Sequence, residues 1–328
     1  MGIKILHGSC LDRLKGLEDQ SINTCITSPP YWGLRNYQEE EQLGLEETPE
    51  EFVENLVNVF REVKRVLRDD GTVWLNLGDS YSNQRSGEGA DTMKNLNVNT
   101  HGYKNPTEKQ EKTNKNFNQR LNYGNLKQKN LVGIPWRVAF ALQADGWYLR
   151  QDIIWHKPNP MPESVTDRCT KAHEYIFLLS KQAKYYYDNE AIKEDCVGKD
   201  ERKWSDTYDN VGSVVQGDTN ADIKRTKRYS KDGSFKRNKR SVWTVTTKPF
   251  KGAHFATFPM DLIEPCVLAG CPEGGTVLDP FGGSGTTAVV ANSHNRDAIL
   301  IELNEEYIEI AKERIAPDGD LFTEIEVF

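Results

Sequence analysis

The chain has 328 residues and a formal net charge of −7, and this length is enough for one large domain or one domain with a sizeable insertion. Its six cysteines are scattered without a Cys-x-x-Cys pair, which argues against a disulfide framework or a zinc site and predicts a cytoplasmic protein without a metal. No apolar run approaches the roughly 20 residues of a membrane span, so no membrane contact is expected.

Hydrophobic periodicity predicts short strands that alternate with helices. Apolar runs bounded by turn residues predict strands at 4–6, 22–27, 72–77, 148–156, 174–179, 276–279 and 298–302. Apolar residues at helical spacing predict helices at 11–17, 49–68, 136–144, 286–293 and 305–315. The alternation predicts an α/β fold with a doubly wound, mainly parallel sheet.

Two polar segments interrupt this alternation. Residues 82–130 are rich in asparagine and poor in apolar residues, so they predict a flexible insertion or a segment that becomes ordered on binding. Residues 189–248 are polar and basic, with nine lysines and arginines between Lys224 and Arg240 against one acid. This run suits a phosphate-contacting surface, with a solvated charged loop as the alternative. The candidate contacts are Lys224, Arg225, Lys227, Arg228, Lys236, Arg237, Lys239 and Arg240.

A glycine-rich segment, Asp-Pro-Phe-Gly-Gly-Ser-Gly-Thr-Thr at 279–287, joins a predicted strand to a predicted helix. It has neither the Lys-Ser/Thr of a phosphate-binding loop nor the Gly-x-Gly-x-x-Gly spacing of a dinucleotide site. The segment therefore suits a ligand without phosphates, whose carboxylate could face the helix N-terminus near Thr286. Glu302 ends the next strand, where an acid can accept hydrogen bonds from ribose hydroxyls. A tight turn that binds nothing is the alternative.

A second motif, Thr-Ser-Pro-Pro-Tyr-Trp at 27–32, follows the strand predicted at 22–27. Two prolines fix φ and restrict the residue before them, so the motif predicts a rigid platform at a strand end. A Pro-Pro turn with a packing tyrosine is the structural alternative.

Together the two motifs resemble those of the amino-DNA methyltransferases. That family's catalytic motif reads Ser/Asp/Asn-Pro-Pro-Tyr/Phe/Trp, and its S-adenosylmethionine loop reads Phe-x-Gly-x-Gly. Here the catalytic motif comes first, as in the permuted β class, and the resemblance covers about residues 3–80, 131–188 and 250–316. It implies a Rossmann-like sheet with circularly permuted motif order and a basic recognition insertion, S-adenosylmethionine as cofactor, and duplex DNA as partner. A homodimer and a cognate restriction endonuclease are further partners that this class suggests.

The resemblance also implies roles for individual residues. The catalytic residues are Ser28, Pro29, Pro30 and Tyr31, which would hold the amino group of an extruded base and stack against its ring. The family's Gly-Asp pair near the first strand is Gly-Ser-Cys here, so the adenine contact falls to Ser9 or Cys10. The implied cofactor contacts are Ser9, Cys10, Phe258, Asp279, Phe281, Gly283, Gly285, Thr286, Thr287 and Glu302.

Domain boundaries follow from the same resemblance. Residues 1–81 and 131–188 form the catalytic half, 249–328 the cofactor-binding half, 82–130 the flexible insertion, and 189–248 the target-recognition region. Ser28 before the prolines resembles the cytosine-N4 enzymes, whereas aspartate is commoner in the adenine-N6 enzymes. Cytosine N4 is therefore the predicted target, with adenine N6 and a catalytically silent DNA-binding protein as alternatives.

Three further polar residues lie in the region of the predicted site. His156 and His173 invite a general-base or metal reading, although lone histidines near strands are more often structural. Asp79 follows the strand at 72–77 and either lines the pocket or caps a turn.

Overall fold

The computed structural model describes residues 2–34, 39, 41–82, 121–195, 236–247, 258–316 and 324–328. Its contacts divide the chain into a large unit, Met1–Asp188 with Ser241–Phe328, and a small unit, Asn189–Arg240. Within the described residues, no helix is both long enough and apolar enough to cross a membrane. The predicted insertion at 82–130 lies mostly outside the described residues.

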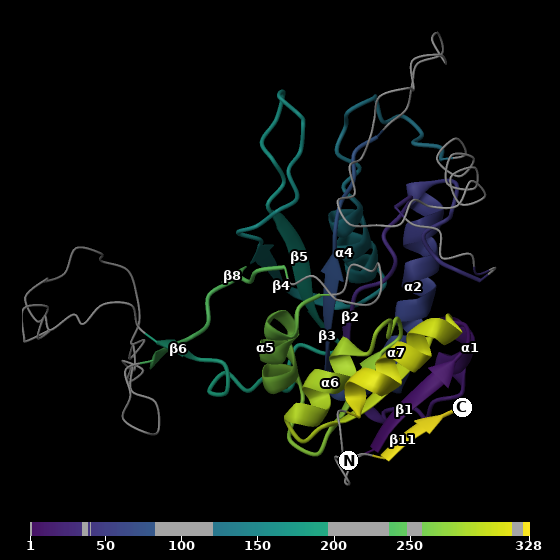
Figure 1. Cartoon of the computed structure of the whole chain (residues 1–328), viewed down its shortest axis with the longest axis vertical. Helices are drawn as coiled ribbons and strands as arrows, with labels where there is room; N and C mark the ends of the chain where they lie inside the picture. Colours follow the sequence, from purple (N-terminus) through teal and green to yellow (C-terminus); the bar gives the residue numbers. More distant parts are fainter. Residues whose placement is uncertain are drawn as a thin grey trace, which may run out of the picture. The chain divides into compact units, whose positions relative to one another are not determined.

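The large unit is built on one mixed sheet (Figure 1). Among the described residues this sheet has nine strands in the order β11-β1-β10-β9-β2-β3-β5-β4-β8. Every neighbouring pair is parallel except β3 with β5 and β4 with β5, so β5 alone runs in the opposite direction. The strands are β1 Gly2–His7, β2 Ile22–Thr27, β3 Leu67–Leu77, β4 Tyr148–His156, β5 His173–Ser180, β8 Val242–Thr244, β9 Thr276–Asp279, β10 Asp297–Glu302 and β11 Glu324–Val327.

Two groups of helices cover the sheet (Figure 1). The alternation of side chains along β2 and β3 shows which face α2 and α4 cover and which face α5 covers. Cys25, Val73 and Leu75 pack in one core with α2 and α4. The intervening residues face α5, because a Cβ on Gly270 would lie 2.6 Å from Trp74 Nε1 and 2.9 Å from Thr24 Oγ1. The helices are α1 Cys10–Lys15, α2 Pro49–Val66, α4 Ile134–Ala144, α5 Met260–Gly270, α6 Thr286–Ser293 and α7 Glu305–Ile315.

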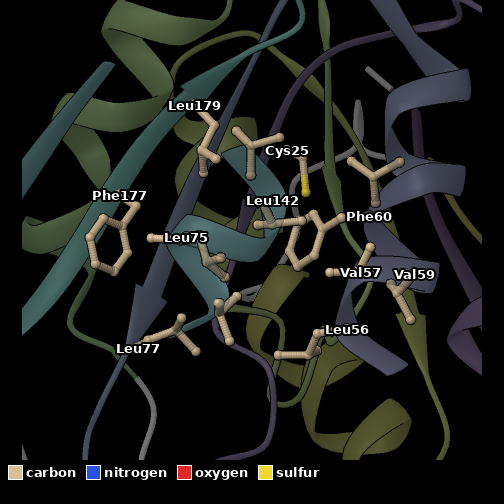
Figure 2. Packing of buried hydrophobic residues seen from close by; sticks show 14 of the residues in the cluster. Cys25, Leu56, Val57, Val59, Phe60, Leu75, Leu77, Leu142, Phe177 and Leu179 are labelled. Atoms are coloured by element: carbon tan, nitrogen blue, oxygen red, sulfur yellow. The ribbon is translucent and has the colours of Figure 1, made fainter. Parts of the chain in front are cut away.

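The core between α2, α4 and the sheet consists of aliphatic and aromatic side chains (Figure 2). Leu56 and Phe60 of α2 and Leu142 of α4 are fully buried, and so are Leu75 and Phe177 of the sheet. Burying a side chain of this size stabilises the fold by about 1.5–3 kcal/mol. This packing holds β2 and β3, and therefore the loops at their carboxyl ends, in fixed positions.

Helix α2 has the N-terminal features that its sequence predicts. Thr48 accepts a hydrogen bond from the backbone of Glu51 while the Glu51 side chain accepts one from the backbone of Thr48, and Pro49 occupies the first turn. The predicted end at residue 68 is wrong, because the helix ends at Val66 and β3 begins directly at Leu67. Strand pairing of Ile22 with Leu67 extends β3 five residues before the predicted start.

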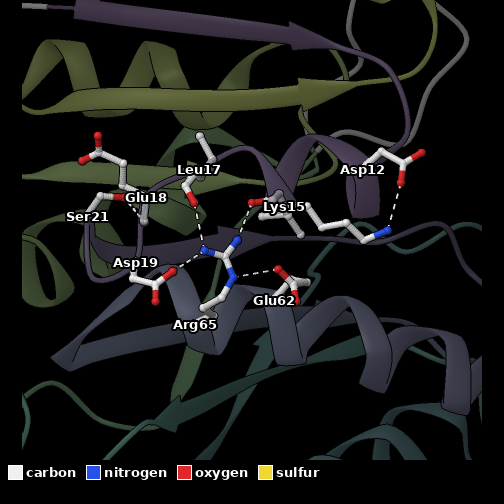
Figure 3. A network of polar contacts seen from close by, with 9 residues as sticks. Asp12, Lys15, Leu17, Glu18, Asp19, Ser21, Glu62 and Arg65 are labelled. Atoms are coloured by element: carbon white, nitrogen blue, oxygen red, sulfur yellow. Dashed lines mark hydrogen bonds and ion pairs between the residues drawn. The ribbon is translucent and has the colours of Figure 1, made fainter.

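Arg65, near the end of α2, fastens the turn between α1 and β2 (Figure 3). Its guanidinium donates to the carbonyl oxygens of Leu14 and Leu17 at 2.8 and 2.9 Å. It also pairs with Asp19 at 2.5 Å and Glu62 at 2.8 Å. The Arg65 side chain therefore connects α2 to the end of α1 and to the turn that leads into β2.

The small unit contains a two-stranded antiparallel sheet of β6 Glu194–Asp195 and β7 Lys236–Arg237. The Glu194 carboxylate accepts hydrogen bonds from Arg237 Nε at 2.9 Å and Arg240 Nε at 2.7 Å. Residues 241–247 of the predicted recognition region belong to the large unit, since β8 pairs with β4.

Candidate active site

Four parallel strands of the large unit end at one cavity. The segments after β1, β2 and β9 and the end of β10 line it, together with Phe258, Glu39 and residues 41–43. Both sequence motifs contribute to this strand-end cavity. The predicted residues that line it are Ser9, Cys10, Ser28, Pro29, Pro30, Tyr31, Phe258, Asp279, Phe281, Gly283, Thr286 and Glu302.

The glycines after β9 have different structural roles. Gly285 is the N-cap of α6 at φ +78°, and a Cβ there would lie 2.9 Å from Ala311 Cβ, so helix packing requires glycine. Gly283 has φ +50°, but its Cβ would approach nothing closer than Phe281 O at 3.9 Å. Gly283 lines the strand-end cavity and Gly285 does not. Gly283 thus leaves room for a ligand, whereas Gly285 leaves room for α7.

Glu302 closes the cavity at the end of β10. Its carboxylate accepts hydrogen bonds from the backbone of Gly283 at 2.7 Å and of Asn304 at 2.9 Å. Burial raises the pKa of this carboxyl group, and the two backbone hydrogen bonds act in the opposite direction. Each carboxylate oxygen keeps a second lone pair for a ligand hydroxyl.

Asp279 joins the two motifs. Its carboxylate accepts hydrogen bonds from Thr27 Oγ1 and Thr287 Oγ1, both at 2.6 Å, and from the backbone of Phe281 at 3.1 Å. Burial raises its pKa to about 6. Thr287 is fully buried and does not line the strand-end cavity, so its hydroxyl contacts Asp279 within the protein. Because Thr27 precedes Ser28, Asp279 fixes the catalytic motif relative to the glycine loop.

Tyr31 is held at its hydroxyl and along its ring. The hydroxyl donates to Glu174 Oε2 at 2.9 Å and lies 3.3 Å from Asn76 Oδ1. The ring covers Gly78, where a Cβ would collide with Tyr31 Cε2 and lie 3.0 Å from Tyr31 Cδ2. Sequence reasoning missed Asn76, Gly78 and Glu174 as neighbours of this motif, because nothing in a single strand's pattern indicates which side chains meet across strands.

Cys10 lies in the strand-end cavity, and burial raises the pKa of its thiol to about 12. The thiol is therefore neutral at physiological pH and behaves as a small apolar surface.

Sequence reasoning also missed Arg314 of α7, whose guanidinium donates to Ser284 O and Ser284 Oγ at 2.6 Å and to Thr286 Oγ1 at 3.0 Å. Burial lowers the pKa of Arg314.

The remaining polar candidates have structural contacts. Asp79 Oδ1 accepts hydrogen bonds from the backbones of Gly133 and Ile134 at 2.9 and 3.1 Å, so it caps α4. His156 Nδ1 lies 3.1 Å from Thr244 Oγ1, and the His173 ring packs edge-on against Tyr175 with 5.4 Å between the ring centroids. Burial lowers the pKa of His173. In the described part of the chain, no group of three or more His, Cys, Asp or Glu side chains is placed to hold a metal ion.

The predicted DNA contacts are only partly covered by the structure. Lys236 and Arg237 form β7, and Lys239 and Arg240 follow it in the small unit. Arg237 and Arg240 are paired with Glu194. Lys224, Arg225, Lys227 and Arg228 lie outside the described residues.

A family model described as DNA methylase, N6_N4_Mtase, matches residues 22–313. The chain belongs to this family. A relative of this methyltransferase is the type II methyltransferase M.Cfr9I of Citrobacter freundii, which is 44% identical over 314 residues covering 96% of this chain and 88% of that protein. Membership confirms the predicted enzyme class, a DNA methyltransferase that uses S-adenosylmethionine as methyl donor.

Two solved structures share the fold of this methyltransferase. TTHA0409 from Thermus thermophilus, solved with S-adenosyl-L-methionine, has a TM-score of 0.58 at 22% identity, and the match covers 99% of this chain and 98% of that one. The cytosine-N4-specific PvuII DNA methyltransferase has a TM-score of 0.61 at 17% identity, with 97% and 89% covered. The predicted Rossmann-like α/β fold is therefore confirmed.

The strand-end cavity of this methyltransferase fits S-adenosylmethionine. Because Gly283 has no Cβ, there is space for a ligand at this part of the cavity wall. The buried Glu302 carboxylate can accept hydrogen bonds from ligand hydroxyl groups. The N-terminus of α6 at Thr286 suits a carboxylate. These residues would hold the cofactor, which supplies an electrophilic methyl group when bound.

Proposed function

We propose that this methyltransferase modifies the exocyclic N4 of cytosine in duplex DNA after the base is extruded from the helix. One observation carries the proposal. Ser28 and Tyr31 line the same cavity as Gly283 and Glu302, so the residues assigned to the base and to the methyl donor face one shared space. Extruding a base costs a few kcal/mol, which contacts with the duplex would offset.

The chemistry of the catalytic motif supports this assignment. An exocyclic amino nitrogen is a poor nucleophile because its lone pair is delocalised into the ring. Acceptors that hold its N–H groups out of the ring plane raise the electron density on nitrogen. The Ser28 hydroxyl and the Pro29 carbonyl can act as these acceptors, and the proline ring fixes the backbone geometry around that carbonyl. Tyr31 would stack on the base.

The choice of cytosine over adenine rests on Ser28. Serine before Pro-Pro resembles the cytosine-N4 members of the family, whereas aspartate is commoner among the adenine-N6 members. Adenine N6 is the second candidate, because both bases present an amino group to the same two acceptors.

The chain also divides by role in this proposal. Residues 1–81 and 131–188 form the catalytic half, 249–328 the cofactor half, 82–130 an insertion, and 189–248 the recognition region. The basic residues Lys236, Arg237, Lys239 and Arg240 support phosphate contacts in that region. We further expect a homodimer and a cognate restriction endonuclease, the latter in line with the type II relative.

Identifying the modified nucleoside tests the proposal. Plasmid DNA methylated by the enzyme in vitro would be digested to nucleosides and analysed by mass spectrometry, with Ser28→Ala enzyme as the control. We expect N4-methylcytosine from wild-type enzyme and much less from the control. N6-methyladenine as the sole product would overturn the assignment of the base and leave the shared cavity in place.

A further inference from the structure

Glu174 reaches the active site because β5 runs against its neighbours. In the parallel strands, the residues at the carboxyl ends meet at the active-site edge of the sheet. Glu174 lies near the start of β5, opposite Trp155 of β4 and one residue before Tyr175, which pairs with Leu77 of β3. Because β5 is reversed, its amino-terminal end lies at the edge where Tyr31 lies, and the Glu174 carboxylate lies there with it.

The two oxygens of Glu174 have different partners. Oε2 accepts the hydroxyl of Tyr31 at 2.9 Å, and Oε1 forms an ion pair with Lys157 Nζ. The side chains of Lys157 and Glu174 are only 18% and 16% exposed. Lys157 Nζ also lies 4.1 Å from the centroid of the Trp155 ring. The carboxylate is therefore held by Lys157 at Oε1, and its Oε2 accepts from both Tyr31 and Asn76 Nδ2, the latter at 3.4 Å.

These contacts leave the Tyr31 ring little freedom. Gly78 lies under the ring, so close that a Cβ there would collide with it, and the hydroxyl is tethered at the far end. Asn76 joins the same cluster, since its Nδ2 donates to Tyr175 O at 3.1 Å while its Oδ1 lies 3.3 Å from the Tyr31 hydroxyl. A ring held in this way is already ordered before a base arrives.

We propose that Glu174, held by Lys157, is a positioning residue that fixes the Tyr31 ring as the stacking face for the extruded base. The proposal rests on the function proposed above for Tyr31. Glu174 acts through the tyrosine hydroxyl and does not line the strand-end cavity. Its removal should therefore impair base capture and transfer without changing cofactor affinity.

A double-mutant cycle between Glu174→Ala and Tyr31→Phe tests this coupling. Single-turnover methyl transfer and the fluorescence of 2-aminopurine at the target position would be measured, with cofactor affinity determined by calorimetry. Each single variant should lose about 10-fold or more in transfer rate, the loss expected when a hydrogen bond to a charged group is removed. The double variant should be no slower than the slower single variant, because both changes remove the same hydrogen bond between Tyr31 and Glu174.

Two further variants keep the test sharp. Glu174→Gln retains an acceptor oxygen and should recover most of the rate and fluorescence lost in Glu174→Ala. Glu264→Ala, which removes from α5 the ion-pair partner of His294, is the control for loss of a glutamate carboxylate and should behave as wild type. Losses that multiply in the double variant would overturn the proposal, as would wild-type transfer by Glu174→Ala. Wild-type transfer by Tyr31→Ala would instead overturn the proposed role of the catalytic motif itself.

Discussion

At the residue scale, two glycines after β9 serve different purposes: Gly283 leaves space for a ligand, and Gly285 allows α7 to pack closely. Gly283→Ala places a methyl group in the strand-end cavity and costs about 1–2 kcal/mol for its left-handed φ. Gly285→Ala has a similar φ and also drives a Cβ to 2.9 Å from Ala311 Cβ. We expect Gly283→Ala to remain folded and bind S-adenosylmethionine at least about 10-fold more weakly, and Gly285→Ala to be the less stable variant. Calorimetry and thermal unfolding measure both effects, and equal cofactor affinity in wild type and Gly283→Ala would contradict the assignment.

Ser28 allows chemistry to be separated from cofactor binding. Ser28→Ala removes an acceptor aimed at the amino group of the base and should reduce methyl transfer about 10²–10³-fold, the effect of losing one preorganised contact. Cofactor affinity should stay near the wild-type value, since the other walls of the strand-end cavity are unchanged. Single-turnover transfer and calorimetry are the measurements. Undiminished transfer would remove Ser28 from the catalytic centre.

Asp279 makes stability depend on pH. Its pKa rises from 3.8 to about 6 on folding because the carboxylate is buried. The folded state therefore binds the proton more tightly than the unfolded state, and the stability that this gives is present below pH 3.8 and is lost as pH rises to about 6. Relative to wild type, Asp279→Asn should gain in free energy of unfolding as pH rises from about 4 to 7. Denaturant unfolding at several pH values measures the difference, and a difference that does not change with pH would refute the prediction.

At the element scale, Arg65 should matter far more than its exposed neighbour. Arg65→Met removes the donors to the carbonyl oxygens of Leu14 and Leu17, so it should lower the free energy of unfolding by about 1–3 kcal/mol. Arg68→Met is the matched control, because the Arg68 side chain is 54% exposed and its ion pair with Asp70 spans 3.4 Å. The control should change stability by about 0.5 kcal/mol or less. Equal losses in both variants would show that Arg65 does not fasten this turn.

At the scale of the whole molecule, the small unit supplies the charge that the overall composition lacks. The net charge of −7 opposes DNA binding, whereas β7 and the residues after it are basic. Arg237 and Arg240 contact Glu194 through Nε, so this carboxylate competes with phosphates for their positive charge. We expect the double variant Arg237→Gln with Arg240→Gln to bind DNA more weakly and to lower the salt-dependence slope by up to about 0.9 per arginine.

Charge-matched substitutions in the large unit are the control for this prediction. The pair Arg61→Gln with Arg68→Gln removes two exposed positive charges, one within α2 and one just beyond its end, and should leave the salt slope unchanged. Cofactor affinity should be the same in all of these variants. An unchanged slope in the Arg237 and Arg240 variant would move the phosphate contacts to other residues.

The sequence alone determined the elements whose signals are local. Strand 22–27 and helix 286–293 were predicted with their observed bounds, because alternation, helical spacing and flanking turn residues act within a few positions. The two motifs were likewise readable, since each lies directly after a predictable strand. Hydrophobic periodicity alone did not predict helix α5, because the helix is apolar around much of its surface and contains Pro265.

Only the tertiary structure decided which side chains meet. The reversal of β5 brings Glu174 to Tyr31, and Asp79 turns to cap α4 away from the strand-end cavity. Gly283 and Gly285 look equivalent in the sequence, yet one faces open space and the other faces Ala311. Strand direction and order follow from packing between residues far apart in the chain, and a periodicity that spans a few residues carries no information about such contacts.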